Sequence, residues 1–182
     1  MRKLTYGAAV SLDGYIATAD GGVDWLKWSD DVAAVTSAYW NTVDTVLVGR
    51  KTYDVGVRMG TSSYPGKMTY VFSRTPRTAT PNEAGVEWVS TDPVEFVRSL
   101  RQRDGMGICV LGGGELARGL IEAGLVDEVG CNIHPILLGS GVPLFRPLSR
   151  RLDLELIDSR TFEHGCVYLL YRIACCGNAG ET

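Results

Sequence analysis

Short apolar runs alternate along the chain with segments whose apolar residues recur every three or four positions. Residues 45–48 and 108–111 are continuous runs of the kind that forms strands covered on both faces. Further strands are predicted at residues 4–10, 68–72, 86–89 and 126–133. Because strands alternate with helical segments, the pattern predicts an α/β fold with a mostly parallel central sheet flanked by helices.

The helices are marked by residues that favour helix ends. Ser29 is a candidate cap for a helix over residues 30–42, whose Val32, Val35, Tyr39 and Val43 share one face. Asp92, followed by Pro93 and Glu95, is a capping pattern that begins another helix. Shorter helices are predicted directly after Gly49 and after the glycines at 112–114, the second ending at Gly124.

The last part of the pattern predicts an antiparallel hairpin. Residues 152–161 and 166–172 read as two strands that turn at His164-Gly165. With no linker or repeat in between, residues 1–173 are expected to form a single domain, and residues 174–182 a flexible tail. The exposed edge of this hairpin makes a homodimer a natural expectation.

Composition narrows the classes of protein. The formal net charge is −3 and 45% of residues are hydrophobic, as in an ordinary globular protein and without the positive charge of a nucleic-acid binder. No run approaches the roughly 20 apolar residues of a membrane span, and no signal peptide is visible, so we expect a cytoplasmic protein. Cys109, Cys131 and Cys166 are expected to be buried thiols, and the chain has only two histidines, so no metal site is predicted.

Two strand-to-helix junctions combine small or polar residues with cations. Gly49 is followed by Arg50-Lys51-Thr52, and the strand at 68–72 is followed by Ser73-Arg74. In an open α/β sheet ligands bind beyond the carboxyl ends of strands, where helix N-termini favour phosphate. The alternative at Gly49 is a turn that carries solvated cations, and at Ser73-Arg74 an ordinary polar turn is the more common explanation of such a pair.

The third junction holds three consecutive glycines, Gly112-Gly113-Gly114, between a buried strand and a helix. Such a run is entropically costly, and the close approach of a ligand to bare backbone is a reason to keep it. With Ala117 the glycines also match the dinucleotide-binding pattern G-x-G-x-x-A. That pattern normally follows the first strand of its fold, so we interpret this one as a phosphate-binding turn in another fold.

Four motifs together resemble a known family. They are Ser11-Leu-Asp-Gly-Tyr-Ile-Ala17, Val48-Gly-Arg-Lys-Thr-Tyr53, Leu111-Gly-Gly-Gly-Glu-Leu116 and Pro135-Ile-Leu-Leu-Gly-Ser-Gly-Val-Pro-Leu-Phe145. Over about residues 3–173 the chain is similar to the dihydrofolate-reductase-like superfamily, and most of all to the reductase domain of bacterial riboflavin-biosynthesis deaminase-reductases. The resemblance implies a dihydrofolate-reductase-like sheet and NADPH as cofactor.

The resemblance also assigns residues to the cofactor. The Gly-Arg-Lys-Thr and Ser-Arg turns would hold the adenosine 2′-phosphate, the glycines the pyrophosphate, and Ala9 and Ile16 the nicotinamide side. The expected NADPH-binding residues are Ala9, Ile16, Gly49, Arg50, Lys51, Thr52, Ser73, Arg74, Leu111, Gly112, Gly113, Gly114, Glu115 and Leu116.

Asp13 corresponds to the acid that the riboflavin branch prefers, and it is the candidate catalytic residue, with a turn-forming Asp-Gly as the alternative. His134 precedes Pro135 and is interpreted mainly as a group that satisfies a strand end. The candidate substrate-binding residues are Trp25, Trp28 and Trp40, whose alternative is a core or dimer contact, and Gly139 and Gly141, whose alternative is a packed turn.

The expected function is an NADPH-dependent oxidoreductase that transfers a hydride to a small planar heterocycle or conjugated carbonyl. The acid that binds pteridine in dihydrofolate reductases has no counterpart near Ala33-Ala34, although Asp30 and Asp31 lie one turn earlier. The alternatives are reduction of 5-amino-6-(5-phosphoribosylamino)uracil in riboflavin biosynthesis, with Arg146, Arg150 and Arg151 for the substrate phosphate, and NADPH binding without turnover. The sequence contains neither of the zinc-deaminase motifs H-x-E and P-C-x-x-C, so we do not expect the bifunctional enzyme.

Overall fold

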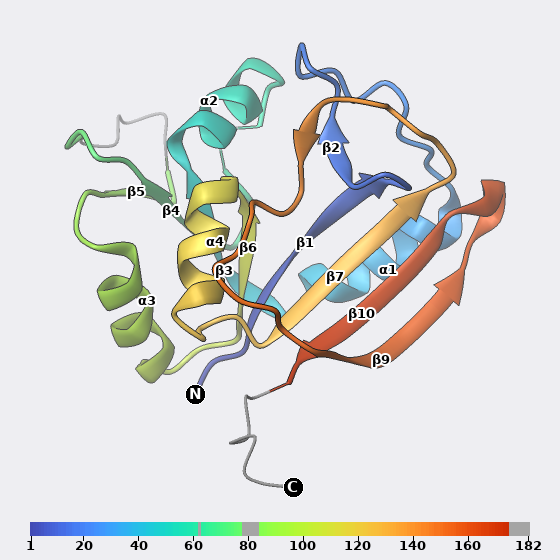
Figure 1. Ribbon diagram of the computed structural model, residues 1–182. Helices are drawn as coiled ribbons and strands as arrows, with labels where there is room; N and C mark the ends of the chain where they lie inside the picture. The colour runs from blue at the N-terminus through green and yellow to red at the C-terminus, as the bar shows by residue number, and fades with distance from the viewer. Residues whose placement is uncertain (62, 78–83, 175–182) are drawn as a thin grey trace, which may run out of the picture.

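The computed structural model describes residues 1–61, 63–77 and 84–174, and one large sheet forms its centre (Figure 1). In these ranges eight strands lie in the order β5-β4-β3-β6-β1-β7-β10-β9. Their bounds are β1 Leu4–Ser11, β3 Val43–Gly49, β4 Met68–Phe72, β5 Val86–Val89, β6 Gly107–Gly112, β7 Glu128–His134, β9 Leu154–Thr161 and β10 Val167–Ile173.

The direction of the strands confirms the predicted fold class. Strands β5, β4, β3, β6, β1 and β7 pair in parallel, whereas β10 is antiparallel to both β7 and β9. The hairpin turns at η1, Glu163–Gly165, where His164 has a φ of 59°. A parallel sheet with an antiparallel edge is therefore the frame that positions every junction discussed below.

Helices cover both faces of the sheet. Helices α3, Pro93–Gln102, and α4, Gly114–Glu122, bury Val97, Leu100 and Leu120 against one face in the main core. Helix α1, Asp30–Trp40, crosses behind β1 and β7 in Figure 1 and faces the other side of the sheet. Helix α2, Arg50–Arg58, packs Tyr53 on that second side, against Val48 and Val71.

The predicted side-chain cap is confirmed at the start of α3, and it is wrong at the start of α1. The Asp92 side chain accepts a hydrogen bond of 2.9 Å from Glu95 N, as its capping pattern predicts. The Ser29 side chain does not cap α1, because its hydroxyl donates to Asp31 instead. Helix α1 also ends two residues earlier than predicted, so that Val43 lies in β3 and not on the helix.

A small second sheet was not predicted. Strand β2, Tyr15–Ala17, pairs antiparallel with β8, Val142–Pro143, in segments that the sequence pattern assigns to loops. Gly141 is required there, because a β-carbon on it would stand 2.1 Å from the Ala17 carbonyl oxygen. The second sheet therefore fixes the loop after β7 to the loop after β1.

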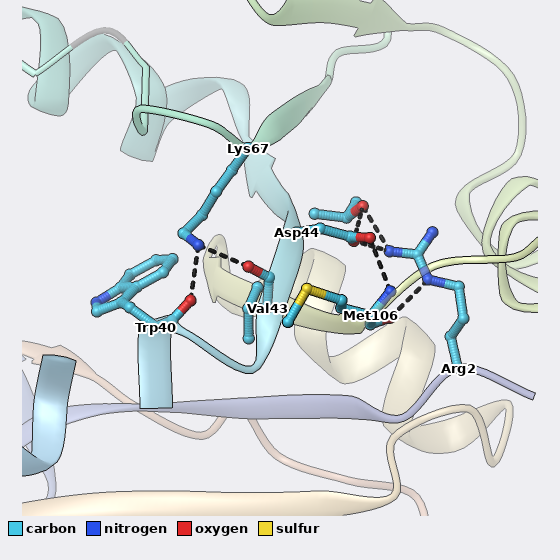
Figure 2. Close-up of polar contacts among 7 residues, drawn as sticks. Arg2, Trp40, Val43, Asp44, Lys67 and Met106 are labelled. Atoms are coloured by element: carbon cyan, nitrogen blue, oxygen red, sulfur yellow. Dashed lines mark hydrogen bonds and ion pairs between the residues drawn. The ribbon is translucent and has the colours of Figure 1, made fainter. Parts of the chain in front are cut away.

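Two polar clusters fasten the ends of α1, β3 and β6 (Figure 2). Lys67 Nζ donates to the carbonyl oxygens of Trp40 and Val43, each at 2.6 Å. The buried Arg2 guanidinium pairs with Asp44 and donates to the Met106 carbonyl oxygen at 2.7 Å. These contacts hold the last turn of α1 to the start of β3, and the N-terminal segment to the start of β6.

None of the helices in the described ranges has the length and hydropathy needed to span a bilayer. Cys109 and Cys166 are buried and Cys131 is partly buried, and all three are thiols. Cys175, Cys176 and almost all of the expected tail at 174–182 lie outside the described residues.

Candidate functional site

The three predicted junctions meet at one edge of the sheet. Strands β4, β3 and β6 are neighbours, and the register places Gly49 beside Phe72 and Val48 beside Gly112. Ser73 directly follows β4, and its backbone N–H is bonded to the Val89 carbonyl oxygen at 3.0 Å. The carboxyl ends of these strands therefore bring the Gly-Arg-Lys-Thr turn, the Ser-Arg turn and the triple glycine side by side.

The glycines at this edge are explained first by contact between the turns themselves. A β-carbon on Gly113 would lie 3.0 Å from Gly49 Cα, and one on Gly112 would lie 2.8 Å from Thr52 Cγ2. Gly113 also has a φ of 96°, in the left-handed region that favours glycine. The close approach inferred from the sequence is thus made by one turn to the other.

This contact places two helix N-termini next to each other. Helix α2 begins at Arg50 directly after Gly49, and α4 begins at Gly114 directly after Gly113. Neither Gly49 nor Gly113 has a side chain to cap its helix, so backbone N–H groups of both first turns are available to an anion. Two adjacent N-termini of this kind suit a pyrophosphate.

Cations surround the paired turns. Arg50 is exposed and forms an ion pair of 3.1 Å with Asp54 of its own helix. The side chains of Lys51 and Arg74 make no hydrogen bond or ion pair within the described part of the chain. Arg146 lies over Gly114, where its Cγ is 3.1 Å from an added β-carbon, and it is 3.6 Å from Glu115. The positive charge needed for a nucleotide phosphate is therefore present beside the turns.

A cavity of about 310 Å³ opens between α1 and the second face of the sheet. Ala9 and Leu111, two of the predicted cofactor residues, line it, and Leu111 directly precedes the triple glycine on β6. One wall of the cavity therefore lies next to the triple-glycine turn in the chain. Its walls are mostly apolar and come from Thr5, Gly7, Ala8, Ala9, Leu26, Lys27, Trp28, Val32, Val35, Thr36, Tyr39, Trp40, Cys109, Leu111, Gly130, Asn132, His134, Phe162 and Tyr168.

The three tryptophans assigned to substrate have three different environments. Trp40 lines the cavity, but its ring is stacked on Tyr64 at 5.1 Å between centroids and lies 5.6 Å from Lys67 Nζ. Trp28 also lines the cavity and remains 64% exposed, so its ring is accessible for stacking. Trp25 does not line the cavity; it packs edge-on against His134 at 5.4 Å.

Asp13 fastens two loops together. Its carboxylate accepts hydrogen bonds from Ser11 Oγ at 2.6 Å, Leu138 N at 3.1 Å and Gly139 N at 2.7 Å. These bonds, that from Ser11 above all, lower the pKa of Asp13 below its ordinary value. Asp13, Gly139 and Gly141 do not line the cavity, so their assigned roles in catalysis and substrate binding stay predictions.

No carboxylate lines the cavity within the described residues. Ala33 and Ala34, where the dihydrofolate reductase acid was sought, are exposed. The cavity-facing positions of α1 carry Val32, Val35 and Thr36 instead. Nor does any group of three or more His, Cys, Asp and Glu side chains in the described ranges form a potential metal site.

The polar groups of the cavity are ones that the motifs did not indicate. Asn132 and His134 lie on β7, and Thr36 and Tyr39 on α1. A usable signal was present in β7, because Asn132 and His134 alternate with apolar Cys131 and Ile133 and so share one face of a strand. That alternation marks a polar face beneath α1.

Comparison with known proteins identifies the family. Residues 2–168 match the model of the RibD C-terminal domain. The chain belongs to this family. The Bacillus subtilis protein YyaP is 34% identical over 93% of this chain and 94% of its own length, and YwjB of the same organism is 35% identical over 88% and 92%.

Solved structures agree with the assignment. A putative riboflavin biosynthesis protein from Shewanella sp. is 29% identical, with a TM-score of 0.83 over 95% of this chain and 99% of that one. The Thermotoga maritima deaminase/5-amino-6-(5-phosphoribosylamino)uracil reductase is 19% identical, with a TM-score of 0.73 over 95% of this chain and 57% of that one. Dihydrofolate reductase from Enterococcus faecalis, solved with NADP(H), is 18% identical with a TM-score of 0.67, over 94% and 96%, and shares the fold.

Proposed function

We propose that this RibD-type protein is an NADPH-dependent reductase of a small planar heterocycle or conjugated carbonyl. The observation that carries the proposal is the contact between Gly49 and Gly113, which joins two helix N-termini. Leu111, which directly precedes the glycines, lines an apolar cavity. One end of this arrangement suits phosphate, and the other suits planar rings. A dinucleotide has both parts, and β6 connects the two places here through Leu111 and Gly112.

The residues of the chain divide the binding between them. The first turns of α2 and α4 face the pyrophosphate with their N–H groups, and Arg50, Lys51 and Arg74 face the adenosine 2′-phosphate. Ala9 and Leu111 bring the nicotinamide end into the cavity, where apolar walls pack against its ring. NADPH, when bound there, supplies the hydride.

Proton delivery in this proposal falls to water. No acid lines the cavity in the described ranges, and the hydrogen bonds of Asp13 favour its ionised form. Water reaches the cavity beside exposed Trp28. Asp13 then serves the reaction by holding the loop at Leu138 and Gly139, and its role as proton donor stays the alternative.

Family membership favours reduction of the phosphoribosyl aminouracil as a second candidate. That substrate needs a cationic site for its own phosphate. Of the three arginines considered, Arg146 lies at the α4 turn, Arg151 is paired with Asp153 at 3.3 Å, and Arg150 lines a separate cavity beside Lys3 and Arg172. Because none of the three lines the cavity between α1 and the sheet, the broader reductase proposal is preferred.

The deciding experiment is a fluorescence titration of the protein with NADPH and with NADH. We expect NADPH to bind at least tenfold more tightly, and Arg50→Ala to remove most of that preference, since a charged hydrogen bond contributes about 1.5–3 kcal/mol. Arg58→Ala, at the far end of α2, is the matched control and should retain the preference. Equal affinities in the unaltered protein would contradict the assignment of the 2′-phosphate site.

Turnover distinguishes an enzyme from a binding protein. Oxidation of NADPH is followed at saturating cofactor with folates, pyrimidines and quinones as substrate candidates. Steady oxidation with one class supports the reductase. Saturable NADPH binding without turnover on any of them favours the non-catalytic alternative.

A further inference from the structure

The cavity between α1 and the sheet has one charged side chain in its wall. Of the lining residues in the described part of the chain, only Lys27 carries a charge, and the others are apolar or neutral polar groups. Burial lowers the pKa of His134, so that ring is neutral at neutral pH. Lys27 is exposed and also lines the cavity, which places it at the mouth. The hydride transfer proposed above makes no use of this cation.

The backbone of Lys27 is held in place by a buried group. Its N–H donates a hydrogen bond of 3.1 Å to Nδ1 of His134, which lies on β7 and is 2% exposed. The ring of Trp25 packs edge-on against the same imidazole, with 5.4 Å between the centroids. The segment that carries Lys27 is therefore fastened to the sheet, and its side chain starts from a defined point at the cavity mouth.

The ammonium group of Lys27 has no partner of its own. It makes no hydrogen bond or ion pair within the described ranges of the chain. Asp24, Asp30 and Asp31 are close in sequence, but none of them lines the cavity or comes within ion-pair distance of Lys27. The Asp31 carboxylate instead accepts a hydrogen bond of 2.9 Å from the backbone N–H of Glu163. The negative charge that pairs with Lys27 is therefore left for a ligand to supply.

The order of the strands separates this cation from the nicotinamide end of the cavity. Strand β1 lies between β6 and β7. Leu111 on β6 and Ala9 on β1 line the predicted nicotinamide end, whereas Lys27 is bonded to His134 on β7. Trp28, next to Lys27, lines the same cavity and is 64% exposed, so a planar ring can stack on it. A ring that lies between these two ends has one edge toward the nicotinamide and another toward Lys27.

We propose that Lys27 binds a single carboxylate on the substrate ring, so that the substrate is a planar ring acid. The inference rests on the proposed function in that the cavity is taken as the substrate site. One ammonium neutralises one negative charge, whereas a phosphate dianion would leave a second charge beside apolar walls. The paired turns, which we assign to phosphates, offer several cations and backbone N–H groups, and the cavity mouth offers one cation.

The test measures ring binding directly by titration calorimetry, with 2-naphthoate and 2-naphthamide as matched probes. The two have the same planar ring and differ in presenting a carboxylate or a neutral amide. We expect the unaltered protein to prefer the carboxylate about fivefold, as one ion pair that water still reaches implies. The preference should shrink at about 0.5 M salt, because salt screens an exposed pair.

Three variants assign the preference to one side chain. Lys27→Met removes the charge and keeps a long apolar stem, so it should remove or invert the preference, because apolar walls favour the neutral amide. Lys27→Arg keeps the charge and should retain the preference. Arg103→Met, at the exposed end of α3, is the matched control for the loss of one positive charge and should also retain it. Since Lys27 is exposed and its backbone bond is unaltered, its variants should fold.

The contrary outcomes are distinct. Equal binding of the two probes, binding of neither, or a preference that Lys27→Met retains would overturn the role of Lys27. A preference that Arg50→Ala removes and Lys27→Met retains would place the carboxylate at the paired turns and overturn it as well. Tighter binding of 2-naphthyl phosphate than of 2-naphthoate would overturn the choice of a carboxylate.

The probes also separate this inference from the proposed function, because the NADPH titration is independent of them. A carboxylate preference that depends on Lys27, in a protein that does not bind NADPH, would support the ring-acid site and remove the proposed cofactor. NADPH binding without a carboxylate preference would overturn the ring-acid site and leave the proposed reductase standing.

Discussion

Gly49 and Gly113 touch through their backbones, so that a β-carbon on Gly113 would stand 3.0 Å from Gly49 Cα. We expect Gly113→Ala to destabilise the protein by about 1–3 kcal/mol, because alanine at positive φ is strained and the two turns must separate. NADPH binding should weaken with it. Urea unfolding and the cofactor titration measure the two effects.

Gly119→Ala is the control for that substitution. Gly119 lies within α4, and a β-carbon there meets nothing within 4 Å. Since alanine favours a helix over glycine by about 1 kcal/mol, this variant should be as stable as the unaltered protein or slightly more so. A Gly113→Ala protein that behaves in the same way would contradict the contact between the turns.

Lys67 connects the end of α1 to the start of β3 through two carbonyl oxygens and lies near the Trp40 ring (Figure 2). Lys67→Met should lower the free energy of unfolding by about 2 kcal/mol, because it leaves carbonyl groups without their charged donor. Tryptophan emission should also change, because the Trp40 backbone and ring lose their contacts with Lys67. Arg58→Met, in the last turn of α2, should show neither effect.

His134 predicts a pH dependence of stability. Its pKa is lowered in the folded protein from the ordinary 6.5, chiefly by burial, so the unfolded chain binds the extra proton. The stabilising contribution is present above about pH 6.5 and is lost as pH falls below it, by at most about 1.4 kcal/mol per pH unit. Urea unfolding at pH 7.5 and 5.5 should show a slope that His134→Gln removes and the exposed His164→Gln retains.

Asp13 should control the exchange of two backbone amides. Asp13→Asn weakens the acceptors for Leu138 N–H and Gly139 N–H, so both should exchange faster with deuterium. Because the pKa of Asp13 is lowered, the contribution of the carboxylate is present above its ordinary pKa of 3.8 and is lost as pH falls further. Asp20→Asn, in a local turn with Thr18, should leave these two amides unchanged.

The face of β9 and β10 on the side of α4 predicts a homodimer. No helix covers these strands there in Figure 1, and Leu154 and Leu156 of β9 are 47% and 52% exposed. Pairing places Leu169 on the same face as Cys131, and a second copy of the chain would cover this row. Leu156→Glu should give monomers in sedimentation equilibrium, whereas Val57→Glu on α2 should not. A monomer at micromolar concentration in the unaltered protein would contradict the prediction.

The sheet could be predicted because most of its parallel strands contain short apolar runs, and the helix ends because Asp92 and Gly124 are local signals. The pairing of β2 with β8 could not be predicted. Strands of three and two residues are too short to show a hydrophobic period in the sequence, and their pairing depends on contact between distant loops. The three junctions followed from the rule that parallel strands end at one edge. The reason for their glycines, contact between turns, needs the third dimension.

The cavity was harder to foresee than the cofactor turns. Phosphate-binding turns repeat a local pattern of glycines and cations, whereas the cavity wall combines α1, β1, β6, β7 and β10. Trp28 and Trp40 were placed there from their planar rings, but nothing in the sequence indicates that Tyr64 already covers a face of Trp40. Asn132 escaped notice because a single amide on a strand has no motif.

Strand β1 comes first in the chain and yet lies between β6 and β7. Its partners, Ile108–Val110 and Glu128–His134, are translated more than a hundred residues after it. During synthesis the apolar side chains of β1 therefore stay unpaired with β6 and β7 until most of the chain has left the ribosome. Such late closure slows folding, and it exposes the nascent chain to chaperones and aggregation for longer than a sheet assembled in chain order.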